Sequence, residues 1–353
     1  MNNGGIKKMV DSIGLPRLII TGFFIILLIA AAPLGLSIPA LLGDCIRRWG
    51  MYGILVLAMV PAVQCGIGLN FGISLGIVSG LLGALVTIEM KIANPWAAMF
   101  LAMAIGTVLA SLIGIGYGFL LNRLKGSEMT VSTYVGFSII AFMNIMWLSL
   151  PFKSGEIIWP LGGQGMRNTI NLASSFGEVL NNTAGFYIGS DLFIPTGLII
   201  FFLLMCLVVY LFMRSKIGMA MSSAGANPAF ARSTGINVDK MRILGTAVST
   251  ALAAIGIITY AQSYGFLQLY NAPLMMGFHC VAAVLIGGAT VSRAKISHVL
   301  IGTFLFQGIL AVALPVVNKI LPESNLSDII RIIISNGIIL YALSKTKGGR
   351  GSE

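Results

Sequence analysis

The side chains that could contact a solute in this sequence are neutral hydrogen-bonding and aromatic groups within long apolar runs. Such groups offer hydrogen bonds and ring faces without charge, which suits a hydroxyl-rich, uncharged solute better than an ion. One of them, His279, is ionisable, and a lone histidine in an apolar run more often packs with a hydrogen bond than binds a ligand. The predicted contacts are Asn70, Phe71, Ser74, Thr133, Tyr134, Asn144, Gln262, Tyr264 and His279.

No pattern typical of an enzyme accompanies these residues. The apolar runs hold no paired carboxylates, no P-loop is present, and the 4 cysteines lack metal or redox spacing. We therefore expect a chain that is not an enzyme and binds neither a metal nor a cofactor itself. The apolar runs also lack the buried Asp, Glu or Lys of many ion-coupled carriers. This favours a transport pore whose energy comes from another protein.

The composition requires a lipid environment for the elements that position these residues. The chain has 353 residues, of which 57% are hydrophobic and 9% are charged, whereas soluble domains carry about 25% charged residues. Its net charge of +11 comes from basic residues scattered beside apolar runs. That scatter is typical of orientation signals in a membrane protein, and it argues against a nucleic-acid partner.

Charge-free stretches predict an all-α, polytopic membrane protein with about ten transmembrane helices. A helix needs about 20 mostly apolar residues to cross a bilayer. By this measure two stretches hold two spans each and six hold one. The double stretches are 49–88 and 243–292, and the single ones are 18–43, 92–122, 129–152, 192–213, 296–318 and 326–344.

The distribution of Lys and Arg predicts the orientation. Most basic residues fall on one side when both termini are placed in the cytoplasm, as the positive-inside rule requires. Arg47 and Arg48 oppose the rule, because they fall in the first predicted external loop. We expect one transmembrane domain over 1–353, with five spans in 18–152, an external loop at 151–190, five spans in 192–344 and a cytoplasmic loop at 214–242.

A polar segment at 225–237 in that cytoplasmic loop carries the signals of a short helix. Asn227 suits the N-cap, Pro228 the first helical position, and Gly235 a left-handed C-terminal stop. A polar helix there has no role within the membrane, so we expect it to dock a soluble motor. The predicted docking residues are Gly225, Asn227, Pro228, Ala229, Phe230, Ala231, Arg232, Ser233 and Gly235.

A second segment, 66–74, combines closely spaced glycines with the polar side chains of Asn70 and Ser74. Irregular backbone at membrane depth is tolerated only where it is buried in protein or lines a water-filled cavity. We therefore expect a helix break beside a solute path.

These segments resemble a known family. Gly225-Ala226-Asn227-Pro228, Ala231-Arg232 and Gly235-Ile236-Asn237-Val238 resemble the cytoplasmic loop of the ribose/galactoside-type and branched-chain amino-acid-type permeases of bacterial ABC importers. Residues 68–74 look like a degenerate form of that family's Gly-Ile-Asp-Leu-Ser segment. Residues 282–290 are similar to its alanine-rich Ile-Gly-Gly-Thr segment, and Gly302-Thr303 falls where the family often has Gly-Thr.

The resemblance implies a type II ABC importer-like permease in the bacterial plasma (inner) membrane. Two permease chains, identical or paralogous, would form the pore. Two cytoplasmic ABC ATPase subunits would hydrolyse ATP and bind the short helix at 225–237, the coupling helix. An extracytoplasmic solute-binding protein would deliver the solute. This chain would itself bind no cofactor.

The sequence departs from the family at Asn70-Phe71-Gly72, where Asp-Leu-Ser is usual, and at Val291 to Lys295. These departures leave the cargo open. A sugar-like solute leads, and nucleosides or branched-chain amino acids are alternatives for the same machine. A stand-alone secondary carrier or channel is an alternative of a different class.

Overall fold

The computed structural model describes residues 15–158, 165–320, 332–333, 336–341 and 344. Most of this part of the chain, 74%, is helical, which confirms the all-α class. The helices before the central loop are α2 (Leu15–Ala31), α3 (Ile38–Leu57), α4 (Met59–Gln64), the 3-10 helix η1 (Phe71–Ile73), α5 (Ser74–Glu89), α6 (Pro95–Arg123) and α7 (Glu128–Ser149). The later ones are α8 (Val179–Asn182), α9 (Thr196–Arg214), α10 (Lys216–Ala226), α11 (Pro228–Ser233), α12 (Val238–Tyr264), α13 (Asn271–Ile286) and α14 (Ile296–Ile320).

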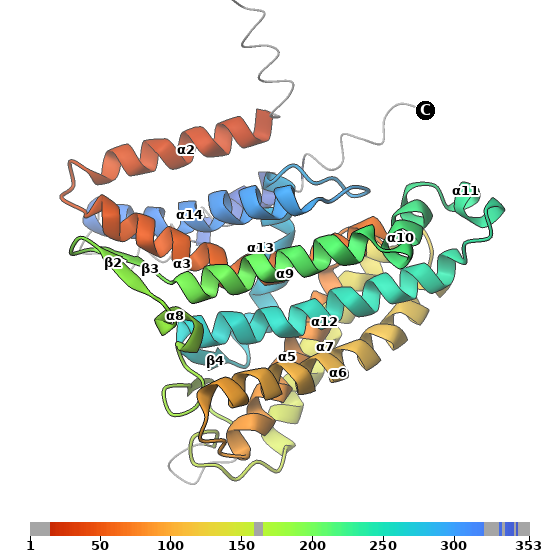
Figure 1. Cartoon of the computed structure of the whole chain (residues 1–353), viewed down its shortest axis with the longest axis horizontal. Helices are drawn as coiled ribbons and strands as arrows, with labels where there is room; N and C mark the ends of the chain where they lie inside the picture. The colour runs from red at the N-terminus through yellow and green to blue at the C-terminus, as the bar shows by residue number, and fades with distance from the viewer. Residues whose placement is uncertain (1–14, 159–164, 321–331, 334–335, 342–343, 345–353) are drawn as a thin grey trace, which may run out of the picture.

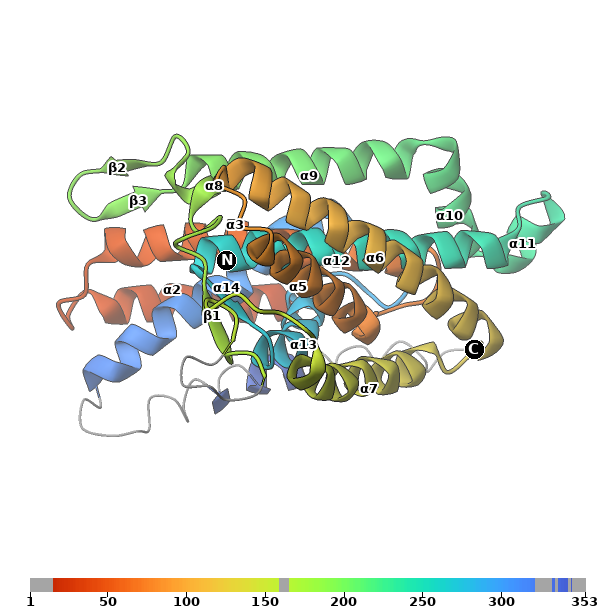
Figure 2. The same ribbon diagram turned by 90° about the horizontal axis from the view of Figure 1, so that it is seen from below.

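Four three-residue strands decorate the bundle. They are β1 (Thr169–Asn171), β2 (Phe186–Ile188), β3 (Leu192–Ile194) and β4 (Phe266–Gln268), and they form two antiparallel pairs, β1 with β4 and β2 with β3. The hairpin of β2 and β3 lies at one end of the bundle, and α10 and α11 lie at the opposite end (Figures 1 and 2).

The central helix of the bundle is α12, which packs most extensively on α6, α5 and α3. Small residues allow this close approach. A Cβ built on Gly80 of α5 would lie 2.7 Å from the carbonyl oxygen of Ala254 in α12, and one on Gly83 would lie 2.5 Å from that of Ala102 in α6. Membrane helices gain packing contacts when small residues bring their backbones together. The glycines of the apolar runs at these positions therefore serve packing.

Seven helices of the described part are long and apolar enough to cross a membrane. They are Ile38–Gln64, Phe71–Glu89, Pro95–Arg123, Glu128–Ser149, Thr196–Arg214, Val238–Tyr264 and Ile296–Ile320. Two shorter apolar helices, Arg17–Ala31 and Asn271–Ile286, fall at two more of the predicted spans. The last predicted span, 326–344, lies largely outside the described residues, so the number ten stays a prediction.

One predicted boundary is wrong. Helix α2 ends at Ala31, and Arg47 and Arg48 lie inside α3 rather than in a loop after a span at 18–43. The carboxylate of Asp44 explains the difference, because it accepts hydrogen bonds from Arg47 Nη2 at 2.6 Å and from Arg48 Nε at 2.9 Å. Partners three and four residues apart share one face of a helix. The charges therefore pair within α3, and the chain turns earlier, at 32–37.

Candidate functional site

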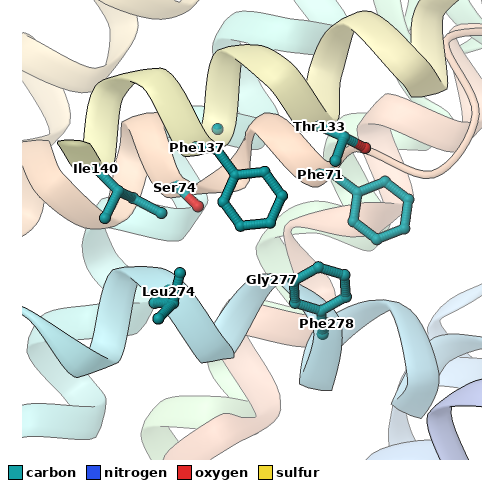
Figure 3. Close-up of a pocket in the computed structure, with 9 residues that line it drawn as sticks. Phe71, Ser74, Thr133, Phe137, Ile140, Leu274, Gly277 and Phe278 are labelled. Carbon is teal, nitrogen blue, oxygen red and sulfur yellow. The ribbon is translucent and has the colours of Figure 1, made fainter. Parts of the chain in front are cut away.

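A narrow cleft opens where α7 faces η1, the start of α5 and the first half of α13 (Figure 3). Four of its residues come from α7 at positions 133, 136, 137 and 140, a spacing that places them on one face of a helix. The lining consists of Phe71, Ser74, Thr133, Gly136, Phe137, Ile140, Leu274, Gly277 and Phe278. Three residues predicted to contact solute, Phe71, Ser74 and Thr133, are thus brought together.

Aromatic rings and a glycine close this cleft. The ring of Phe278 lies 5.6 Å from that of Phe71 and 6.2 Å from that of Phe137, measured between centroids. On α7, a Cβ at Gly136 would lie 2.8 Å from the carbonyl oxygen of Phe71, so α7 approaches as closely as only glycine permits. The cleft volume is about 10 Å³, about what one water molecule needs. In this conformation the cleft does not hold a solute the size of a sugar.

The polar groups of the cleft are already partnered by backbone. Ser74 Oγ donates to the carbonyl oxygen of Pro273 at 3.0 Å, and Thr133 Oγ1 donates to that of Met129 at 2.9 Å. Hydroxyl oxygens keep acceptor capacity while they donate. The lining therefore offers ring faces and two hydroxyl acceptors, and none of its nine residues is charged.

Asn70 does not line the cleft; it is fully buried and holds the predicted helix break in place. Its Oδ1 accepts from the Tyr117 hydroxyl at 3.0 Å, and its Nδ2 donates to Ser249 Oγ at 3.2 Å. The break itself lies between the end of α4 and η1, where Gly66 and Gly68 have φ angles of 82° and 88°. Asn70 thus ties the irregular segment to α6 and α12 rather than lining the cleft.

The remaining predicted contacts lie elsewhere. Tyr134 is not among the residues that line the cleft and is 69% exposed, and Asn144 is half-buried further along α7. At the far end of α12, Gln262 Oε1 accepts from the backbone of Leu180 at 3.0 Å, which anchors α8. Tyr264 stacks on Tyr260, with ring centroids 5.5 Å apart.

His279 is half-buried on α13, and its ring packs edge-on against Tyr52 and Phe306. It lies outside the cleft lining. The neighbouring Phe278 lines the cleft instead and was missed, as were Gly136 and Phe137. Gly136 and Phe137 could have been found from Thr133, because positions 133, 136, 137 and 140 share one face of a helix.

Helix α11 is built by the capping residues that its sequence predicts. Asn227 Oδ1 accepts from the backbone N–H of Phe230 at 3.0 Å, Pro228 is the first helical residue, and Gly235 has a φ of 82°. Ala231 is fully buried in a small apolar cluster, so it faces inward. The side chains of Ala229, Phe230, Arg232 and Ser233 are exposed at the tip of the molecule.

Gly225 serves packing in addition. A Cβ there would lie 2.1 Å from the carbonyl oxygen of Gln64, at the end of α4. The backbone of α10 therefore rests directly on the start of the irregular segment that leads to the cleft.

A wider hollow of about 530 Å³ lies at the opposite end of the bundle, between α3 and the β2–β3 hairpin. Asp44, Arg47, Glu178 and Asp191 are among its lining residues. The hydroxyl of Ser37 donates to Asp191 Oδ2 at 2.5 Å, and this hydrogen bond lowers the pKa of the Asp191 carboxyl. It also ties the hairpin to the N-cap of α3.

Comparison with known proteins supports one family. The model of the family described as branched-chain amino acid transport system / permease component matches residues 41–339. A probable ABC transporter permease protein of Escherichia coli (strain K12) is 32% identical over 158 residues, 44% of each chain. The galactofuranose transporter permease protein of the same organism is 27% identical over 172 residues, 48% of this chain and 49% of its own.

A nucleoside ABC transporter permease protein of Lactococcus lactis subsp. cremoris (strain MG1363) is 24% identical over 231 residues, 64% of this chain and 67% of its own. The matches to the two Escherichia coli proteins span about half of their length (44% and 49%). No solved structure matches the chain.

Proposed function

This chain belongs to the family of branched-chain amino acid transport system permease components, and from that premise we propose that it is the membrane subunit of an ABC importer for a sugar-like solute. Its helices would form part of the translocation path in a bacterial plasma membrane, with both termini in the cytoplasm. The observation that carries the cargo proposal is the cleft of α5, α7 and α13, whose nine lining residues include three Phe side chains and no charge.

Such a lining fits the chemistry of a sugar. The apolar face of a sugar ring packs on aromatic rings, and its hydroxyls can donate to the oxygens of Ser74 and Thr133. Since the cleft now has room for about one water molecule, passage requires that α7 and α13 separate. We assign that opening to the transport cycle.

The energy for opening would come from partner subunits. Helix α11 presents an exposed Phe230 and Arg232 at the tip of the bundle, as a coupling helix for a cytoplasmic ATPase requires. The hollow beside the β2–β3 hairpin, at the opposite end, would then face the solute-binding protein. A second permease chain would complete the path, and ATP would be hydrolysed by the partner ATPases.

Nucleosides are the second candidate cargo, favoured by the similarity to the nucleoside permease of Lactococcus lactis and by the stacking surface of Phe71 and Phe278. Branched-chain amino acids fit the cleft less well, because its lining offers no partner for their charged ends. A stand-alone carrier would leave the exposed face of α11 without a role.

The test uses the complete complex. The chain is reconstituted in proteoliposomes with its cognate ATPase and binding protein and given radiolabelled D-fructose, D-galactose, adenosine and L-leucine in turn. We expect ATP-dependent uptake of a sugar. Uptake of adenosine alone would favour the nucleoside alternative. Uptake that persists without the ATPase and follows an ion gradient would refute the importer.

A further inference from the structure

An ion pair between Glu128 and Arg242 joins the first residue of α7 to the fifth residue of α12. The two residues are 114 positions apart in the chain, and their side chains are only 15% and 10% exposed. The second carboxylate oxygen of Glu128 accepts the backbone N–H of Gly126 at 2.8 Å. In the described part of the chain, this is the only ion pair that involves α7.

One side of this pair leads to α11. Val238, four residues before Arg242 in α12, packs with Ala231 of α11 in a buried apolar cluster. Met241, next to Arg242, packs against that cluster and also against a second cluster, which includes Tyr117 and Leu121; Val131 of α7 packs against this second cluster too. A displacement of α11 is therefore passed directly to the first turn of α12, because buried contacts of this kind do not deform continuously.

The other side leads to the cleft. Thr133 lies five residues after Glu128 on α7, about 8 Å along the helix axis, and Gly136 follows one turn later. The buried residues of α7 form a narrow stripe along the helix, Ser132, Gly136, Ile140, Met143 and Trp147, and the other 17 of its 22 residues are partly or fully exposed. A lateral displacement of the first turn of α7 would therefore move the α7 wall of the cleft without disrupting the packing of the core.

We infer that the Glu128–Arg242 pair is the positioning link through which movement of α11 opens the α7 wall of the cleft. The inference rests on the proposed function and adds to it the residues that transmit the movement of the ATPase subunits to the cleft. A neighbouring ion pair, Lys125 with Asp239 at 2.6 Å, joins the same two regions of the chain but is 41% and 54% exposed. Exposed pairs contribute little, so it serves as the matched control.

The test compares two double variants in the complete complex. The variant Glu128→Gln/Arg242→Gln removes both buried charges and keeps hydrogen-bonding groups in place, so it leaves no uncompensated buried charge. We expect it to assemble and hydrolyse ATP but to import about fivefold less solute per ATP, the low end of a typical coupling between sites. The control Lys125→Gln/Asp239→Asn should stay within about twofold of the wild type.

A second readout follows the cleft wall directly. Spin labels on Tyr134→Cys of α7 and Met275→Cys of α13 report the separation of these helices, and the four native cysteines are buried. We expect ATP to change this distance in the wild type and in the control, but not in Glu128→Gln/Arg242→Gln. An unchanged import per ATP, or an unchanged distance response, in that variant overturns the inference. If the wild type itself shows no ATP-dependent uptake, the proposed function fails instead.

Discussion

Replacement of Phe230 by alanine should weaken the hold of the ATPase on α11 without disturbing the fold. The side chain is 60% exposed, and the backbone hydrogen bond of Phe230 to the Asn227 cap does not depend on its ring. A Phe side chain has about 200 Å² to bury, so a partner that covers the exposed part hides about 120 Å². At about 25 cal/mol per Å² this contributes about 3 kcal/mol.

Alanine keeps about a third of that burial, so Phe230→Ala should lose about 2 kcal/mol, which is roughly a 30-fold weaker affinity. The assay titrates the purified ATPase against the chain in nanodiscs and measures the dissociation constant. Phe142→Ala is the matched control, because Phe142 is 55% exposed on α7, far along the chain from α11. An affinity within about twofold of that of the control would refute the docking role of this face.

The remaining predictions concern the cleft and the helix break that Asn70 holds in place. Gly136→Leu should lower uptake at least tenfold, since a Cβ there would lie 2.8 Å from the carbonyl oxygen of Phe71; Gly116→Leu, with open space at its Cβ, should transport normally in the same assay. Asn70→Leu should lower the free energy of unfolding by about 1–3 kcal/mol, because it leaves the buried Tyr117 hydroxyl without its acceptor. Thermal unfolding in detergent measures this change, and the added substitution Tyr117→Phe should recover part of it; a loss that the second substitution deepens would contradict the hydrogen-bond explanation.

Local chemistry made α11 predictable from the sequence. The N-cap amide of Asn227, the proline at the first helical position and the left-handed Gly235 act within one short segment, so residue types alone define its ends. The same kind of reasoning failed at α3. The end of the charge-free stretch 18–43 suggested a loop that holds Arg47 and Arg48, whereas both residues share the carboxylate of Asp44 on one face of α3. The cap of Ser37 and the turn before it were the better signals.

The cleft could be predicted only in part, because its walls come from segments far apart in the chain. Phe71, Ser74 and Thr133 were found as polar or aromatic groups in apolar runs. The same criterion also selected Gln262 and Tyr264, which lie at the C-terminal end of α12 and do not line the cleft. Which polar group reaches a cavity depends on helix rotation and long-range packing. The Glu128–Arg242 pair could not be predicted for the same reason. In the sequence the two residues only precede two separate charge-free stretches, 129–152 and 243–292, and nothing there indicates that they meet.

The buried Ala231 has a consequence for the kinetics of association. A helix of six residues is far too short to persist alone in water, because its nucleation costs more than its few hydrogen bonds return. Here its caps and the seating of Ala231 against Val238 hold it folded before any partner arrives. Binding of a partner to the exposed face around Phe230 therefore carries no entropic cost of ordering this segment, and association needs no folding step.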